Sequence, residues 1–247
     1  MNNAVLTSNA EVLVESPNRV FFCPEESQFY AQCLEKMVLP QGTAADLMVE
    51  FGSGDGSPVI QALLKNPFAG VIHGYELNPE AYHLATRRID QYGLAAHYQI
   101  HNSCFFESCA LAAQFLIANP PYLPAPDNQI YMPSLHGGHD GASITKQLLA
   151  QGCDQAMVMI SAYSNPVDTV NYALRLGYGV VDFMVTPLTF GYYSREPKVR
   201  DSIAQLKRNR QAFFSEKIYF LAGVLFQQKS ASTTCLSEEF LKVMTAL

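Results

Sequence analysis

The sequence contains no tryptophan, no C-x-x-C pair and few charged residues. Of its 247 residues, 15% are charged and 49% are apolar, which excludes a disordered chain. The six cysteines are scattered and no secretory segment is found at the start, so we expect reduced thiols in a cytoplasmic protein. The longest apolar run, Ile218 to Phe226, is too short to span a membrane.

The charge is unevenly distributed along the chain. Sixteen basic against 22 acidic residues give a net charge of −6, which argues against nucleic-acid binding through overall charge. Residues 195–210 carry six basic and two acidic side chains and follow the aromatic pair Tyr192-Tyr193. A solvated helix face is the simpler interpretation of this segment, and a surface for nucleic acid or an acidic peptide is the alternative.

Short apolar runs of strand length alternate with stretches of helical periodicity, the pattern of crossover units on a parallel sheet. We expect strands at Leu47 to Phe51, Val71 to Tyr75, Tyr98 to His101, Phe115 to Ala118, Ala156 to Ala162, Val180 to Val185 and Ile218 to Phe226. The pattern predicts a single α/β domain with a mainly parallel sheet.

Two helices are predicted from the residues that start and end them. Asn78-Pro79 and Asn165-Pro166 each combine a capping side chain with a proline suited to the first helical position. An apolar stripe follows each pair, and Gly93 and Gly177 end the helices.

A glycine-rich turn follows the first strand. The segment Gly52-Ser53-Gly54-Asp55-Gly56 separates this strand from a predicted helix, Pro58 to Leu64. Glycine allows a sharp turn and lets a ligand lie against the backbone. A dinucleotide fingerprint requires its third glycine at position 57, which is Ser57, so the pattern is instead acidic-x-G-x-G-x-G beginning at Glu50.

With this turn, the chain resembles the class I methyltransferases that bind S-adenosylmethionine (SAM). The resemblance implies a Rossmann-like α/β fold whose seven-stranded, mostly parallel sheet has helices on both faces and one antiparallel strand, the last. Glu76, at the end of the second strand, is placed to accept hydrogen bonds from ribose hydroxyls. Asn102 or Ser103 occupies the place of the family's adenine-binding acid, and Phe105 could stack on the ring. The resemblance implies a cofactor site made of Glu50, Gly52, Ser53, Gly54, Gly56, Glu76, Leu77, Asn102, Ser103, Cys104 and Asn119.

Asn119-Pro120-Pro121-Tyr122 ends the fourth strand. Two prolines make the chain rigid, so the Asn119 side-chain oxygen and the Pro120 carbonyl can act as fixed acceptors. Acceptors that hold both N–H bonds of a planar nitrogen orient its lone pair and stabilise the developing positive charge. Tyr122 can stack on a flat substrate. We therefore predict methyl transfer to a planar nitrogen, with Asn119, Pro120 and Tyr122 as catalytic residues.

The motif is similar to those of DNA amino-methyltransferases and, more closely, to that of the HemK-type glutamine methyltransferases of peptide release factors. Two further segments support the closer resemblance: Gly137-Gly138-His139-Asp140-Gly141 with the helix Ala142 to Ala150, and Pro24-Glu25-Glu26-Ser27, which in that family closes over the cofactor. The resemblance implies a protein glutamine as acceptor and SAM as the cofactor. Cys23, Ser103 and Ser161-Ala162-Tyr163 depart from the family pattern.

Several alternatives stay open. The acceptor could be an adenine amine in RNA or DNA, bound through residues 195–210, or the chain could be a SAM-binding module without turnover. A metal site at His136 and His139-Asp140 is disfavoured because no further ligand stands at motif spacing. Expected partners are a protein substrate such as a release factor, and a small partner protein or a second copy.

The expected organisation has three parts. Residues 1–40 form a hairpin (Glu11 to Phe22) and a helix that cover the cofactor site. Residues 41–230 form the SAM-binding core, with an insert at 189–214, and residues 231–247 form a C-terminal helix or tail.

Overall fold

The computed structural model describes residues 20–43, 46–108, 113–229 and 234–247. In these residues seven strands form one sheet in the order β3-β2-β1-β4-β5-β7-β6. The strands are β1 (Leu47–Phe51), β2 (Val71–Tyr75), β3 (Tyr98–His101), β4 (Phe115–Ala118), β5 (Gln155–Ser161), β6 (Tyr178–Thr189) and β7 (Ile218–Gln228). The predicted α/β sheet is confirmed, and β7 is antiparallel to both of its neighbours, β5 and β6.

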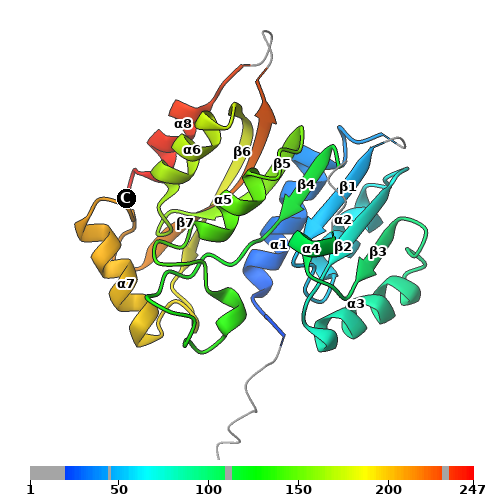
Figure 1. Cartoon of the computed structure of the whole chain (residues 1–247), viewed down its shortest axis with the longest axis horizontal. Helices are drawn as coiled ribbons and strands as arrows, with labels where there is room; N and C mark the ends of the chain where they lie inside the picture. The colour runs from blue at the N-terminus through cyan, green and yellow to red at the C-terminus, as the bar shows by residue number, and fades with distance from the viewer. Residues whose placement is uncertain (1–19, 44–45, 109–112, 230–233) are drawn as a thin grey trace, which may run out of the picture.

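The helices cover both faces of the sheet. They are α1 (Pro24–Cys33), continued by the π-helical turn η1 (Leu34–Val38), α2 (Ser57–Lys65), α3 (Pro79–Gln91), α4 (Phe105–Ser108), α5 (Ser143–Leu149), α6 (Pro166–Arg175), α7 (Pro197–Arg208) and α8 (Ser237–Met244), with a short 3-10 turn η2 (Pro133–Leu135). Figure 1 shows α5, α6 and α8 in front of the sheet and α1 behind it. None of these described helices is long and apolar enough to cross a membrane.

The two faces of the sheet carry separate apolar cores. On one face Phe29 of α1, Val59 of α2 and Ile203 of α7 pack into the same buried cluster. On the other face Leu148 of α5 and Val170 of α6 pack with side chains of the central strands. The two layers of helices together bury the central strands, as a mostly parallel sheet requires.

The two Asn-Pro helix starts behave differently. The Asn78 side chain caps α3 by accepting a hydrogen bond from the backbone N–H of Glu80 at 2.9 Å, as predicted. The same prediction was wrong for Asn165, which has a left-handed φ of 51° and makes no side-chain cap. Its amide instead donates to Asp140 Oδ2 at 2.7 Å, because the loop after β4 brings that carboxylate within reach.

The ends of the chain are only partly described. Most of the predicted hairpin, Glu11 to Phe22, lies outside the described residues. From Pro24 the chain forms α1, and beyond residue 233 it forms α8, whose Phe240 and Met244 are buried against the sheet. Between β6 and β7 lies α7, which buries Val199, Ile203 and Leu206 and exposes most of its basic side chains.

Candidate active site

The carboxyl ends of four neighbouring strands meet at one edge of the sheet. Phe51, at the end of β1, lies opposite Tyr75 of β2 and Ala118 of β4. Tyr75 in turn lies opposite His101 of β3. The connection after β1 runs to β2 on one side, and the connection after β4 runs to β5 on the other side. The direction therefore reverses between β1 and β4, which is where open α/β sheets bind ligands. The residues that follow these strand ends, in spatial order, are Asn102, Glu76, Gly52 and Asn119.

The glycine turn has the shape that the sequence predicted. Gly52 and Gly54 have left-handed φ values of 69° and 56°, and an added Cβ at either position would meet nothing within 4 Å. Glu76 faces this turn and accepts a hydrogen bond from Gly54 N at 2.8 Å through one oxygen and from Asn78 N at 2.7 Å through the other. Each oxygen keeps a second lone pair, so the carboxylate can still accept from hydroxyl groups.

Glu50 lies beneath the turn rather than beside it. The side chain is 1% exposed and accepts hydrogen bonds from Tyr30 and Tyr98. Burial raises the pKa of Glu50 to about 7, although the hydrogen bonds from Tyr98 and Tyr30 oppose the rise. This position fits a residue that supports the turn from below, and direct contact with a cofactor is left to Gly52 to Gly56 and Glu76.

The neighbouring surface, on the β3 side, fits a flat ring. Leu77 is 68% exposed directly after Glu76. Asn102 donates from its amide nitrogen to the carbonyls of Glu76 at 2.8 Å and Leu77 at 3.3 Å, which fixes this segment and leaves its amide oxygen as an acceptor. Phe105 is 3% exposed and packs edge-on against Phe51, so stacking of Phe105 on a bound ring was a wrong expectation. Ser103 and Cys104 are half-buried beside Asn102.

This surface suits a nucleoside with a short charged tail. It combines open space above two left-handed glycines, a carboxylate that faces them and an exposed apolar side chain. The residues present therefore fit SAM. Glu76 would hold its ribose, the backbone of Gly52 to Gly54 its tail, and Leu77 with Asn102 its adenine.

Asn119 lies across β1 from Glu76. Its side-chain oxygen is shielded from solvent and has no hydrogen-bond partner among the described residues. An unsatisfied buried acceptor costs about 1–3 kcal/mol, and such groups in native structures call for an explanation such as a functional role. Ser53 Oγ, below the glycine turn, is unsatisfied in the same way.

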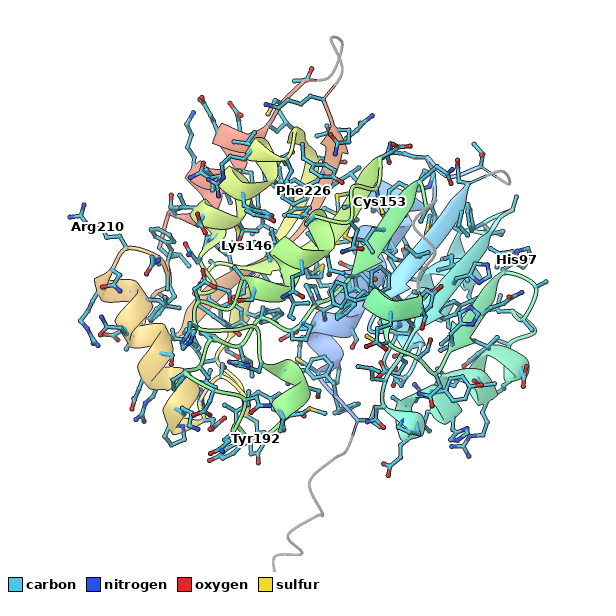
Figure 2. All side chains as sticks on the ribbon, in the orientation of Figure 1. His97, Lys146, Cys153, Tyr192, Arg210 and Phe226 are labelled. Atoms are coloured by element: carbon cyan, nitrogen blue, oxygen red, sulfur yellow. The ribbon has the colours of Figure 1, made fainter. Side chains whose placement is uncertain are left out.

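A cavity of about 270 Å³ opens beside Asn119. Aromatic side chains dominate its walls, namely Phe21, Phe22, Tyr122, Tyr163, Tyr192, Tyr193 and Tyr219. Tyr122 is buried, with its ring centroid 5.8 Å from that of Tyr163. Phe22 and Tyr192, 63% and 69% exposed, lie at the mouth. In Figure 2 Tyr192 is at the lower edge of the molecule, on the side where the chain enters α1.

Glu26, in the first turn of α1, contributes the buried carboxyl of this cavity. Burial raises the pKa of Glu26, and hydrogen bonds from Tyr122, Cys23 and Asn119 partly oppose that rise. The sequence resemblance had marked this stretch as a cofactor cover, but it did not place Glu26 against Asn119. Tyr163 and Tyr219 were also missed as wall residues; the position of Tyr163 just after β5 was the available signal.

The loop after β4 is held by close backbone packing. Leu123 donates to the Leu135 carbonyl at 3.1 Å, and Gly137 donates back to the Leu123 carbonyl at 2.9 Å. Ser164 Oγ donates to the Tyr122 carbonyl at 2.7 Å. A Cβ on Gly137 would lie 2.7 Å from the Gly141 carbonyl oxygen and 2.7 Å from Tyr122 Cα, both backbone atoms.

We therefore expect Gly137→Ala to displace the loop that carries Asn119 to Tyr122. Because backbone must move, the free energy of unfolding should fall by about 1–3 kcal/mol. Any transfer activity should fall at least about tenfold while cofactor affinity is kept, since the glycine turn is untouched. Urea unfolding and calorimetry measure the two effects. The control Gly152→Ala, at a left-handed glycine with nothing within 4 Å, should lose stability without losing activity.

A second pocket, of about 580 Å³, adjoins the first, because Thr189 and Ser194 line both. Arg195, Arg200 and Lys217 line it with one acid, Glu216. The apolar part of its wall is formed by Phe190, Ile203 and Phe214. The pocket combines cations with apolar surface, which suits an anion attached to a flat or apolar group.

Other chemistries find little support in the described residues. Within those ranges no group of three or more His, Cys, Asp or Glu side chains lies close enough to hold a metal ion. Asp140 instead pairs with Lys146 and accepts from Asn165, while His136 contacts the Ala125 carbonyl oxygen at 3.0 Å. No disulfide joins any two of the five described cysteines.

No protein-family model matches the sequence, and neither does any curated protein. The fold has clear structural relatives, all of low sequence identity. A candidate RNA methyltransferase from Pyrococcus horikoshii shares 12% identity at a TM-score of 0.56, over 90% of this chain and 92% of that one. A candidate tRNA (m1A22) methyltransferase from Streptococcus pneumoniae shares 9% at 0.51, over 91% and 82%.

The cyclase SpnF shares 11% identity at a TM-score of 0.51, over 87% of this chain and 86% of that one. That protein is a (4+2)-cyclase, so the same fold supports different reactions and the reaction must be argued from the site. With the strand order and the site edge described above, the chain has the Rossmann-like fold of the methyltransferases.

Proposed function

We propose that the chain is a SAM-dependent N-methyltransferase acting on a planar nitrogen. The observation that supports this best is the pairing of β1 with β4, which sets the open glycine turn directly beside an asparagine whose oxygen has no partner. A donor site and an acceptor site thus share one sheet edge. In a fold of this type the donor binds at this edge of the sheet, and the asparagine oxygen can bind the acceptor nitrogen in the adjacent cavity.

When bound, SAM supplies an electrophilic methyl group on a sulfonium. The Asn119 side-chain oxygen and the Pro120 carbonyl accept hydrogen bonds from the acceptor nitrogen and orient its lone pair. These acceptors also stabilise the positive charge that grows on that nitrogen. The tyrosines of the cavity enclose a flat substrate and offer π-faces to the developing cation. Because the reacting groups are aligned in advance, much of the barrier is removed by positioning.

Two acceptors fit this cavity. A protein glutamine, such as that of a release factor, follows from the Asn-Pro-Pro-Tyr resemblance and matches an apolar cavity lined by tyrosines. An exocyclic amine of a nucleobase in RNA or DNA is supported by the adjoining cationic pocket at Arg195, Arg200 and Lys217. Two structural relatives are described as candidate RNA and tRNA methyltransferases, which favours RNA as the source of the acceptor nitrogen.

Transfer of tritium from labelled SAM to a release factor, to total RNA and to DNA distinguishes these acceptors. Label in the protein fraction identifies the glutamine reaction, and label in nucleic acid identifies the base reaction. Tight SAM binding without transfer to any of them contradicts the proposal and favours a binding module without turnover.

Gly54→Ala tests the donor site by itself. The added methyl meets no protein atom within 4 Å, so it enters the space reserved for the ligand. We expect SAM affinity to fall about tenfold or more by calorimetry. Gly93→Ala is the matched control, since Gly93 also has a left-handed φ, of 67°, and open space around it. Both variants should lose about 1 kcal/mol of stability from backbone conformation. Equal SAM affinity in the two variants would place the donor elsewhere.

A further inference from the structure

After methyl transfer to nitrogen, the methylated nitrogen must release a proton to reach the neutral product. The N–C bond forms as the donor's S–C bond breaks, and the electron pair of that bond stays on sulfur. The nitrogen then carries a positive charge and one proton more than the neutral product. In a cavity walled by aromatic side chains that proton needs a nearby acceptor.

Few described groups that line the cavity can take it. The cavity-lining tyrosines Tyr122, Tyr163, Tyr193 and Tyr219 all have a raised pKa because of burial, and their neutral hydroxyls are poor bases. Burial also raises the pKa of Cys23 to about 12. Among the charged side chains that line the cavity, Glu25 is exposed and Glu26 is 8% exposed.

Glu26 is in contact with the asparagine that holds the acceptor. Hydrogen bonds from Asn119, Tyr122 and Cys23 reach its carboxylate. A nitrogen bound beside Asn119 in the same cavity is therefore beside Glu26 as well. Closeness to the acceptor nitrogen is the first requirement of a general base, and its basicity is the second.

We propose that Glu26 is the proton acceptor of the methyl transfer, taking the proton that the methylated nitrogen releases. This inference rests on the proposed function and adds a catalytic group to it. The nitrogen becomes acidic only after attack, so a carboxylate is a strong enough base. Burial makes this carboxyl more basic than an exposed one, which suits a base working near neutral pH.

The surroundings of Glu26 define its titration. Seven described groups interact electrostatically with the Glu26 carboxyl. They are Cys23, Glu25, Asn119, Tyr122, Tyr163, Tyr193 and Tyr219. No basic side chain appears among them, so burial remains the largest influence and the pKa of Glu26 is raised. Glu50 is the other described carboxyl with a raised pKa, so carbon-13 NMR of glutamate carboxyls should show a second one that titrates above the ordinary range in the chain without any cofactor, and Glu26→Gln should remove it.

Glu26→Gln keeps the size of the side chain and removes the base. We expect single-turnover methyl transfer to fall about 10²-fold, within the range for loss of a general base. The wild-type rate should rise with pH through the pKa of Glu26, because the ionised form is needed, and this rise should be absent from Glu26→Gln. Glu26→Asp should keep the pH dependence at a lower rate. Glu239→Gln, on the exposed face of α8, should behave as the wild type.

The outcomes separate two failures. A wild-type chain that transfers methyl to none of the acceptors overturns the proposed function and this inference with it. An active wild type with a Glu26→Gln variant of equal rate, or of lower rate but unchanged pH dependence, overturns the role of Glu26 alone. A Glu26 carboxyl that titrates in the ordinary range also overturns it.

Discussion

Asn119→Ala should lower the rate of methyl transfer about 10³-fold and leave SAM affinity within about twofold of the wild type. The asparagine oxygen is a buried acceptor that lacks a partner among the described residues, and its backbone comes directly after β4. Removing one preorganised group that stabilises charge in a transition state costs about 10²–10³ in rate. Losing the orientation of the nitrogen adds to that cost.

The contrast between the two measurements tests the idea. Single-turnover tritium transfer reports the chemical step, and calorimetry with SAM reports the donor site. Asn119→Asp is an informative second variant, because it keeps an oxygen acceptor and adds a charge beside Glu26. Wild-type turnover by Asn119→Ala would show that the asparagine does not hold the acceptor nitrogen. A parallel loss of SAM affinity would show that its role lies in the donor site.

The variant should also remain folded. Asn119→Ala removes a side-chain oxygen that has no partner among the described residues, which favours the folded chain, but it also removes the amide that donates to the buried Glu26 carboxyl. The two effects oppose each other, so stability should change by no more than about 1 kcal/mol. A large loss of rate with little change in stability is the expected signature of a residue kept for function.

The sheet edge could be predicted from the sequence because its parts follow strands in a fixed order. Gly52, Glu76 and Asn119 each come directly after an apolar run, and parallel strands bring their carboxyl ends together. The apolar runs therefore indicated that these positions share one edge, and the glycine turn and the Asn-Pro-Pro-Tyr motif indicated what the edge could bind. The antiparallel last strand was expected from the family resemblance, and β6 and β7 extend several residues beyond the predicted ends.

The opposite wall of the cavity could not be predicted in the same way. Glu26 belongs to a helix that packs across the sheet, and its approach to Asn119 depends on the docking of α1, which local pattern does not encode. Tyr219 lies within β7, where alternation does not say which face meets a cavity. Asn165 shows a related limit, because Asp140 competes for its side chain across a distance of 25 residues in sequence.

Glu50 also shows how tertiary contacts determine a residue's role. The sequence assigned it to the cofactor site, whereas in the structure it supports the site from below. Its side chain is enclosed by Tyr30 and Tyr98, with the backbone of Gly74 close by: a Cβ on Gly74 would lie 3.3 Å from Glu50 Oε2. The carboxyl thus connects β1 to α1, β2 and β3 directly under the glycine turn.

This arrangement predicts that the free energy of unfolding falls as pH rises. The pKa of Glu50 is about 7 in the folded chain, because of burial and to a smaller extent the nearby charge of Glu76, against 4.5 for an ordinary glutamate. Between these values the folded chain keeps a proton that the unfolded chain has lost. Stability is then greatest below pH 4.5 as far as this group is concerned and is lost as pH rises through about 7.

The change should amount to about 3 kcal/mol between pH 4.5 and 8, since each pKa unit corresponds to about 1.4 kcal/mol. Urea unfolding of the wild type and of Glu50→Gln at intervals across this range isolates the contribution of Glu50. All other groups are the same in the two proteins, so their contributions cancel in the difference. The free energy of unfolding should change with pH by about that amount less in Glu50→Gln than in the wild type. At pH 8 the free energy of unfolding of Glu50→Gln should equal or exceed that of the wild type. Identical slopes in the two proteins would mean that Glu50 is ionised beneath the glycine turn throughout this range.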